Sequence, residues 1–295
     1  MTAVSTSQEE ILWIESGSQQ LFAIHTAPPG DPLGIGIVLL SGGGWIPSTQ
    51  RNRMYVELAR RLAECGYDVL RFDYRGVGES TGETRMFDLM TPHTSEVLAA
   101  VDALRSRGVA GIGLVGTCYG GRMALHAAGS VADLRVMAIS CIPVEDYPGA
   151  SEGILWHGRQ AMSRDVWRRL RKKWPKYVRV IRKKLKSVAR RFARRAVGTS
   201  DANTRPEYVR QIASALERGV PMVIMHGRKD NHFPQFEAAL QAGLGEVLRQ
   251  HGDLAKLELW DGELHGERTL AAQRYTIEQL YSFLADWAVQ ARARS

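Results

Sequence analysis

The feature that most constrains the fold is a five-residue turn, Gly116-Thr117-Cys118-Tyr119-Gly120, between an apolar run and a helix-forming run. The apolar run, GIGLV, is typical of a buried strand, and the run that follows, GRMALHAA, is typical of a helix. So short a connection forces its central residue into a strained backbone, and side chains on its neighbours would clash with the strand and the helix. Glycines at 116 and 120 remove those clashes. The sequence therefore predicts a sharp strand–turn–helix with Cys118 at its tip.

Short apolar runs alternate with helix-forming runs along most of the chain. Strands are predicted at 35–40, 68–72, 112–115, 136–140, 221–226 and 256–260, and helices near 53–65, 94–107, 119–129, 236–250 and 270–288. Alternating elements with apolar strands are typical of an α/β fold with a mainly parallel, doubly wound sheet. Residues 12–25 are predicted to form an antiparallel hairpin at the edge of that sheet.

A long stretch between residues 143 and 205 interrupts this alternation and contains no strand-like run. Its apolar residues recur every three or four positions, as on one face of an amphipathic helix. Pro175 is predicted to divide the stretch into two helices, because proline suits a first turn and disrupts a helix interior. We therefore assign residues 1–142 and 206–295 to an α/β core and residues 143–205 to an inserted helical cap.

Composition excludes several classes of protein. The 295 residues are 44% hydrophobic and 24% charged, without repeats or low-complexity segments, so a packed core is expected. Cys65, Cys118 and Cys141 are far apart, with no C-x-x-C pair and no histidine at metal-ligand spacing, so neither a disulfide framework nor a zinc site is expected. No metal or organic cofactor is implied. No signal-like segment and no run of about 18 apolar residues is present. We expect a soluble protein of the reducing cytoplasm.

A thiol at the tip of such a turn is placed for nucleophilic attack. It stands at a helix N-terminus, where unpaired N–H groups and the helix dipole favour the thiolate and should lower the pKa of Cys118. Such a nucleophile needs an acid and a histidine base, which follow it in that order after later strands. Asp230 follows the strand-like run 221–226, and His265 follows 256–260. The sequence therefore predicts a catalytic triad of Cys118, His265 and Asp230.

Each member of this triad also has a purely structural interpretation. Cys118 would then be a packed core thiol, Asp230 a turn residue and His265 a surface histidine. Asp146 and His232 are the nearest substitutes for the acid and the base. The presence of all three residue types in the required order favours the catalytic interpretation.

Acyl transfer also needs N–H donors for the oxyanion that forms when the nucleophile attacks. The backbone N–H of Tyr119 follows the nucleophile directly, and the glycine turn at 42–44 follows the strand-like run 35–40. Tyr119 and Gly43 are therefore the predicted oxyanion-hole residues. A phosphate cradle at the same glycines is disfavoured, because no Lys-Ser/Thr pair follows them.

The turn at 116–120, which corresponds to a nucleophile elbow, the strand before it, the acid and the histidine together resemble the α/β-hydrolase superfamily over essentially the whole chain. The run 73–82, DYRGVGESTG, looks like the loop after the fourth strand in its serine-aminopeptidase-like branch. The run 42–82 and the cysteine elbow look most like the exosortase A system-associated hydrolases, which also carry Gly-x-Cys-x-Gly. Thr117, Tyr119 and Trp45 depart from that subfamily's pattern, so its substrate is not carried over.

The resemblance and the thiol together imply an acyl-group enzyme. Attack of Cys118 on an ester or thioester carbonyl would give a thioester intermediate, which water, an amine or another thiol can cleave. We expect an acyl (thio)ester hydrolase or acyltransferase acting on a small-molecule acyl substrate. A dienelactone-type or carbon–carbon hydrolase is one alternative, although dienelactone hydrolases resemble a minimal fold without a cap. A binding or scaffold protein on an inactive hydrolase fold is the other.

Charge is distributed unevenly along the chain. The net charge is +8, yet residues 159–195 hold seventeen Lys/Arg and one acid, so this stretch carries +16 and the rest carries −8. Such a stretch would attract an acidic carrier protein, the phosphates of coenzyme A or an anionic membrane surface. A solvated helix face is the alternative. Nucleic acid is disfavoured, because the aromatic residues of the stretch fall on its apolar stripe, where they pack rather than stack on bases.

Overall fold

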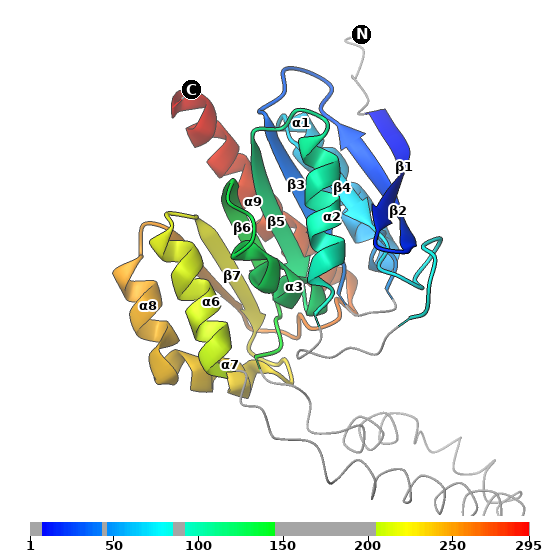
Figure 1. Ribbon diagram of the computed structural model, residues 1–295. Helices are drawn as coiled ribbons and strands as arrows, with labels where there is room; N and C mark the ends of the chain where they lie inside the picture. The colour runs from blue at the N-terminus through cyan, green and yellow to red at the C-terminus, as the bar shows by residue number, and fades with distance from the viewer. Residues whose placement is uncertain (1–7, 43–45, 85–91, 145–204, 295) are drawn as a thin grey trace, which may run out of the picture. The chain divides into compact units, whose positions relative to one another are not determined.

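The computed structural model describes residues 8–42, 46–84, 92–144 and 205–294, and its centre is a sheet (Figure 1). Its eight strands stand in the order β1-β2-β4-β3-β5-β6-β7-β8. The strands are β1 (Gln8–Ser16), β2 (Gln19–Ala27), β3 (Ile35–Leu40), β4 (Asp68–Phe72), β5 (Gly111–Thr117), β6 (Leu134–Ser140), β7 (Met222–Gly227) and β8 (Ala255–Trp260). β1 and β2 form an antiparallel hairpin, and the strands from β4 to β8 run parallel. The predicted α/β fold and its edge hairpin are confirmed.

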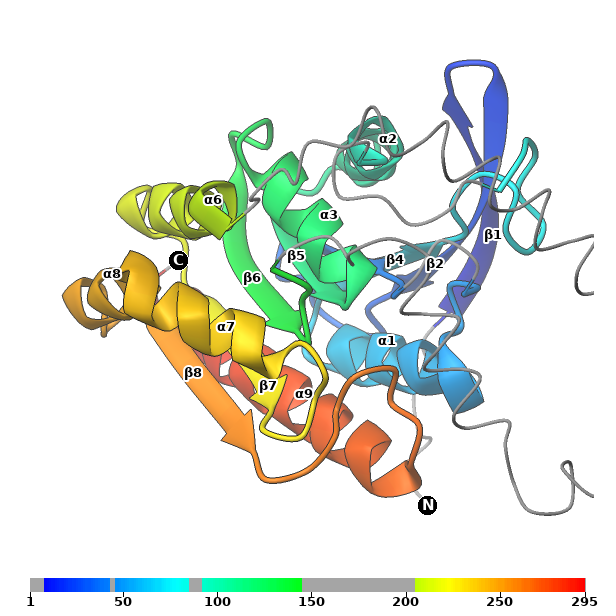
Figure 2. The same ribbon diagram turned by 90° about the horizontal axis from the view of Figure 1, so that it is seen from below.

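Helices cover both faces of this sheet, as Figure 2 shows in a view from below. The α-helices are α1 (Met54–Glu64), α2 (Thr94–Arg105), α3 (Tyr119–Ala128), α6 (Arg205–Glu217), α7 (Phe233–Ala239), α8 (Gly245–Gln250) and α9 (Leu270–Arg294), and shorter turns are η1 (Arg51–Arg53) and η2 (Leu240–Leu244). α1 and α9 pack on one face, and α2, α3 and α6 pack on the other. The chain therefore winds on both sides of the sheet, as the alternating pattern predicts.

One predicted helix is wrong in its continuity. The sequence predicts a single helix over 236–250, but the structure divides this region into α7, a π-helical turn η2 and α8. The break lies at Gly243, whose φ of +117° is incompatible with a helix interior. Glycine adopts that backbone freely, so the helix ends there although the apolar residues keep their helical spacing along the sequence.

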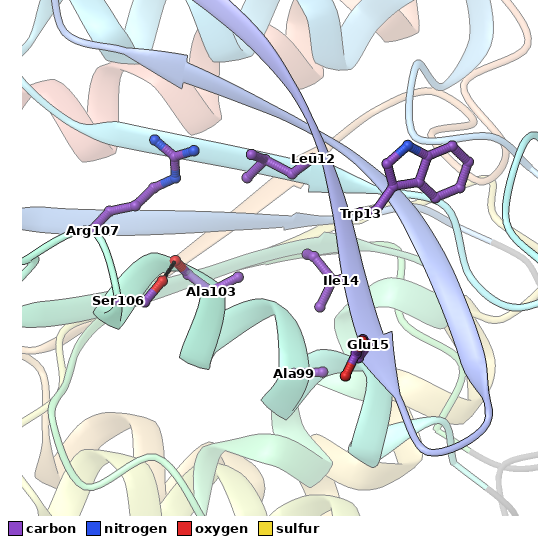
Figure 3. A pocket seen from close by; sticks show the side chains of 8 residues that line it. All are labelled: Leu12, Trp13, Ile14, Glu15, Ala99, Ala103, Ser106 and Arg107. Atoms are coloured by element: carbon purple, nitrogen blue, oxygen red, sulfur yellow. Dashed lines mark hydrogen bonds between the residues drawn. The ribbon is translucent and has the colours of Figure 1, made fainter.

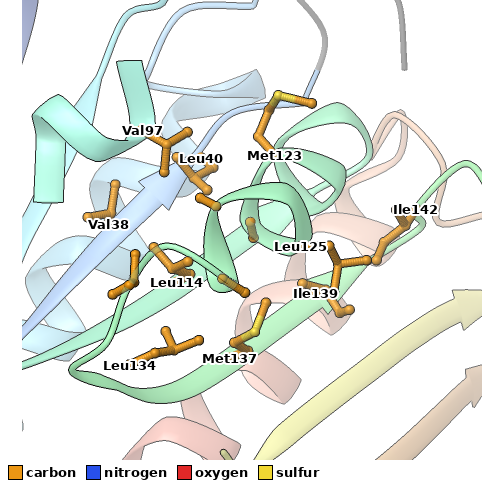
Figure 4. Close-up of a cluster of buried hydrophobic side chains, with 14 of the residues drawn as sticks. Val38, Leu40, Val97, Leu114, Met123, Leu125, Leu134, Met137, Ile139 and Ile142 are labelled. Atoms are coloured by element: carbon orange, nitrogen blue, oxygen red, sulfur yellow. The ribbon is translucent and has the colours of Figure 1, made fainter. Parts of the chain in front are cut away.

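Two apolar cores account for the continuous apolar strands. On one face Val38 and Leu114 of the central strands pack with Val97 of α2 and Met123 of α3 (Figure 4). On the other face the buried side chains of β3 and β5 meet those of α1 and α9. Every residue of β5 is buried, because both of its faces are covered, which is the condition for an apolar run rather than an alternating one.

The predicted cap lies almost wholly outside the described residues. Only Pro143, Val144 and Arg205 of the interval 143–205 are described, and Arg205 already begins α6. The cap, its division at Pro175 and the boundaries of the core therefore stay predictions, and so does the alternative acid Asp146. Among the helices that the structure describes, none has the length and apolar character needed to cross a membrane.

A pocket of about 300 Å³ lies between the edge strand β1 and helix α2 (Figure 3). Its lining residues are Leu12, Trp13, Ile14, Glu15, Ala99, Ala103, Ser106 and Arg107. β2, β4 and β3 separate β1 from β5 in the sheet, so this pocket is remote from the turn at Cys118. None of the predicted site residues lines it.

Candidate active site

The turn predicted at 116–120 is present, and Cys118 is its strained residue. Cys118 connects β5 directly to α3 with φ +49° and ψ −117°, a backbone that side chains rarely adopt. A Cβ on Gly116 would lie 2.4 Å from the Gly120 carbonyl carbon, and one on Gly120 would lie 1.9 Å from the Leu40 carbonyl oxygen. Both glycines are therefore required for strand, turn and helix to approach this closely.

The carboxyl ends of four parallel strands bring the predicted residues to one edge of the sheet. Cys118 follows β5 and His265 lies in the loop after β8, and the Cys118 Sγ atom is 3.4 Å from the His265 Nε2 atom. This distance is within hydrogen-bonding range for sulfur. Two residues far apart in the sequence thus form a thiol–imidazole pair, and Cys118 as a residue is partly buried.

Asp230 contacts His265 through the backbone. The Asp230 Oδ1 atom accepts hydrogen bonds from the N–H groups of Leu264 and His265, each at 2.7 Å, and Oδ2 accepts one from Gly227 at 2.8 Å. In the described part of the chain, no hydrogen bond joins the His265 ring to this carboxylate. The structure therefore places Asp230 where it holds the start of the His265 loop.

Burial dominates the electrostatics of the pair. Burial, with a smaller contribution from Glu267, raises the pKa of the Cys118 thiol well above its usual value, and the Tyr119 backbone N–H opposes this shift. Burial also lowers the pKa of His265 to about 3. The expected lowering of the thiol pKa by the helix N-terminus is therefore wrong, because desolvation of a thiolate outweighs one backbone hydrogen bond. The resting pair is a neutral thiol and a neutral imidazole.

The two predicted oxyanion donors differ in what the structure describes. The backbone N–H of Tyr119 interacts with the Cys118 sulfur, and its ring is buried against Tyr74 and His93. Gly43 lies outside the described residues. The neighbouring Gly42 is described, and a Cβ there would lie 3.2 Å from the Cβ of Cys118. The start of the glycine turn therefore lies beside Cys118. The prediction that Gly43 is an oxyanion donor depends on this proximity.

Sequence reasoning missed one buried acid and underrated one histidine. Glu267 is 2% exposed and lies two residues after His265, yet in the sequence it is indistinguishable from a glutamate on a surface loop. His232, the alternative base, packs its ring perpendicular to that of His265, with centroids 4.6 Å apart. No sequence signal predicts either contact. Among the described residues, no three His, Cys, Asp or Glu side chains gather as a metal site would require.

Comparisons with known proteins agree with the fold. The model of the alpha/beta hydrolase family matches residues 37–259. An esterase of Pyrococcus furiosus has a similar structure with a TM-score of 0.62 at 16% identity, covering 96% of this chain and 92% of the esterase. A serine hydrolase homologue of Coxiella burnetii gives 0.53 at 16% identity, with 94% and 96% covered. A dienelactone hydrolase of Anabaena variabilis gives 0.54 at 14% identity, with the same coverage. No curated protein shows a significant sequence match.

Proposed function

Because the chain belongs to the α/β-hydrolase family, we propose that it is a hydrolase or acyltransferase that carries its acyl group on Cys118. The observation that supports this most directly is the 3.4 Å distance between Cys118 Sγ and His265 Nε2 at the tip of the elbow. A thiol held in a strained turn beside a buried imidazole is the arrangement of an activated nucleophile. The proposed substrate is an acyl ester or thioester.

The reaction begins with proton transfer within the neutral pair. His265 Nε2 takes the proton of Cys118 as the sulfur attacks the carbonyl carbon, and a C–S bond forms. The carbonyl oxygen becomes an oxyanion, for which the proposed donors are the N–H groups of Tyr119 and Gly43. When the tetrahedral intermediate collapses, the bond to the leaving group breaks and that group receives the proton from His265. The product is a thioester on Cys118.

The second half of the reaction releases the acyl group. Water, an amine, an alcohol or a thiol gives its proton to His265 and attacks the thioester, and the sulfur of Cys118 leaves as thiol. Asp230 supports both halves by fixing the His265 backbone through the hydrogen bonds at 2.7 Å. Alcohol and thiol leaving groups suit this neutral pair better than an amine, which is the poorest leaving group of the three.

Several finer proposals rest on sequence alone. The resemblance to exosortase A system-associated hydrolases and a cytoplasmic location are both proposals. So is the partner of the +16 stretch at 159–195, for which an acidic carrier protein, coenzyme A or an anionic membrane surface supplies the matching charge. Nucleic acid stays disfavoured.

Acyl loading can be measured directly by intact-protein mass spectrometry. The native chain would be incubated with a panel of acyl-coenzyme A thioesters, activated esters and a dienelactone, and the modified cysteine located by peptide mapping. We expect a single acyl adduct on Cys118 and none on Cys65 or Cys141, because the Cys118 sulfur has an imidazole at 3.4 Å, whereas Cys65 and Cys141 contact the hydroxyls of Tyr281 and Ser140. The chain length that loads fastest then indicates the substrate class.

Two other outcomes would replace this proposal. Rapid turnover of the lactone without loading by thioesters would favour the dienelactone-type alternative, because the Anabaena variabilis dienelactone hydrolase has a similar fold. If no substrate loads, and an alkylating probe modifies Cys118 no faster than Cys65, the inactive scaffold becomes the better interpretation.

The pH dependence of turnover tests the neutral base. Burial lowers the pKa of His265 to about 3, so the imidazole keeps the lone pair it needs until the pH approaches that value. An ordinary imidazole is half protonated near pH 6.5. We expect kcat/KM to keep its value as the pH falls from 7 to 5, with circular dichroism confirming that the chain stays folded. An acid limb centred near 6.5 in folded protein would contradict this expectation.

A further inference from the structure

A carboxyl group without an assigned role is buried in the loop that follows His265. Glu267 is 2% exposed, and its backbone is fixed at both ends: its N–H donates to the Leu264 carbonyl at 2.9 Å, and its carbonyl accepts from Gln273 Nε2 at 2.6 Å. Its φ of +41° is a strained value for a residue with a side chain. The loop after His265 thus directs a charged residue type into the interior.

The Glu267 carboxyl belongs to a polar cluster around Thr117, the residue before Cys118. The Thr117 hydroxyl accepts a hydrogen bond from Gln50 Nε2 at 2.8 Å, and the Thr117 N–H donates to the Tyr55 hydroxyl at 3.1 Å. The same Thr117 hydroxyl interacts with the Glu267 carboxyl. Within the described ranges, the Oε1 atom of Glu267 has no hydrogen-bond partner, so ionisation would leave charge on an unsatisfied buried oxygen.

The charged and titratable groups around Glu267 come from several elements. They are Arg51 of η1, Tyr55 of α1, Cys118 of the elbow, Cys141 after β6 and Asp230 after β7. Burial raises the pKa of Glu267 to about 8, while the Thr117 hydroxyl and Arg51 oppose this shift and Asp230 adds to it. Glu267 is therefore neutral near pH 7 and gains its charge in mildly alkaline solution.

We propose that Glu267 is a positioning residue that controls the ionisation of Cys118 through Thr117 and through its own charge. When Glu267 is neutral, the thiolate that forms on Cys118 faces no buried anion on this side. When Glu267 ionises, its negative charge opposes that of the thiolate across a buried, weakly screening interior. The inference rests on Cys118 as the nucleophile of the proposed function, and it predicts a reactivity that rises less steeply with pH than a lone thiol allows.

The test uses alkylation of Cys118, which requires no acyl substrate. Iodoacetamide modification of the full chain would be followed by mass spectrometry from pH 6 to 10, for the native protein and for Glu267→Gln. The matched control is Glu263→Gln in the same loop, because Glu263 is 48% exposed and its carboxylate lies 3.8 Å from the solvent-exposed Arg268. If acyl loading fails while the alkylation of Cys118 follows the pH dependence expected below, the proposed function is overturned and this inference stands.

We expect native and Glu267→Gln proteins to react at equal rates below pH 7, where Glu267 is neutral in both. Above pH 9 the glutamine variant should react about tenfold faster, as a thiol pKa lower by about one unit would produce. Glu263→Gln should follow the native profile throughout. Parallel profiles for native and Glu267→Gln proteins, or a slower variant at alkaline pH, would overturn the inference, because a purely structural role changes the rate equally at every pH.

The native protein provides a second test that does not depend on the variant folding. A plot of the logarithm of the alkylation rate against pH should rise with unit slope at low pH and become less steep between about pH 7 and 9, as Glu267 ionises. It should then rise again as the remaining thiol ionises. A single unit slope across this range would overturn the inference. Glu267→Asp, which keeps the charge, should preserve the flattened region.

Discussion

Replacement of Cys118 by alanine is expected to abolish acyl loading and to slow turnover by about 10⁴-fold or more. The alanine side chain has no atom that can bond to the acyl carbon, so no acyl-enzyme forms, and His265 and the proposed oxyanion donors can assist only the much slower direct attack of water. Alanine at position 118 would have the same strained backbone as Cys118, so the fold should be unaffected. Steady-state hydrolysis and intact mass after substrate incubation measure both effects.

Two variants separate the nucleophile from its surroundings. Cys65→Ala removes a thiol that interacts with the Tyr281 hydroxyl far from the elbow, and it should load as the native chain does. His265→Ala keeps the nucleophile but removes the atom 3.4 Å from its sulfur, and loading should slow by about 10²- to 10⁴-fold. Unchanged turnover in Cys118→Ala would mean that another residue carries the reaction.

The fold could be predicted because its signals are local and repeated. Strands with both faces covered need continuous apolar runs, and such runs, separated by helix-forming segments, leave few topologies besides a doubly wound sheet. The elbow was predictable for a stricter reason. A Cβ at 116 or 120 would overlap backbone atoms, so only glycine fits the turn at those two positions. The two glycines therefore identify the residue between them, Cys118, as the candidate nucleophile.

The electrostatics of the site could not be predicted in the same way. A helix N-terminus is visible in the sequence and favours a thiolate, but the burial that raises the pKa of Cys118 depends on which loops cover it. One such loop holds His265 and Glu267, whose approach to the elbow is fixed by Asp230 through backbone hydrogen bonds. Residue types in a sequence carry no record of those distances. The break of the predicted helix at Gly243 has a similar origin, because apolar spacing does not show the sign of φ.

Substitution of Gly120 by alanine is expected to destabilise the whole fold, by about 3 kcal/mol or more. The added Cβ would lie 1.9 Å from the Leu40 carbonyl oxygen and 2.8 Å from that of Ser41, both backbone atoms at the end of the central strand β3. β3 is paired on both sides, with β4 and β5, so it cannot move away without breaking sheet hydrogen bonds. Urea unfolding followed by circular dichroism would give the change in the free energy of unfolding.

Gly129→Ala is the matched control because Gly129 caps the same helix, α3, with φ −64° and no atom within 4 Å of an added Cβ. Its free energy of unfolding should change by about 0.5 kcal/mol or less. If Gly120→Ala is equally tolerated, α3 does not approach β3 as closely as the elbow requires. The strain at Cys118 would then be relaxed, and the thiol would lose the position opposite His265 on which the proposed chemistry depends. The glycine therefore links the stability of the fold to the geometry of the site.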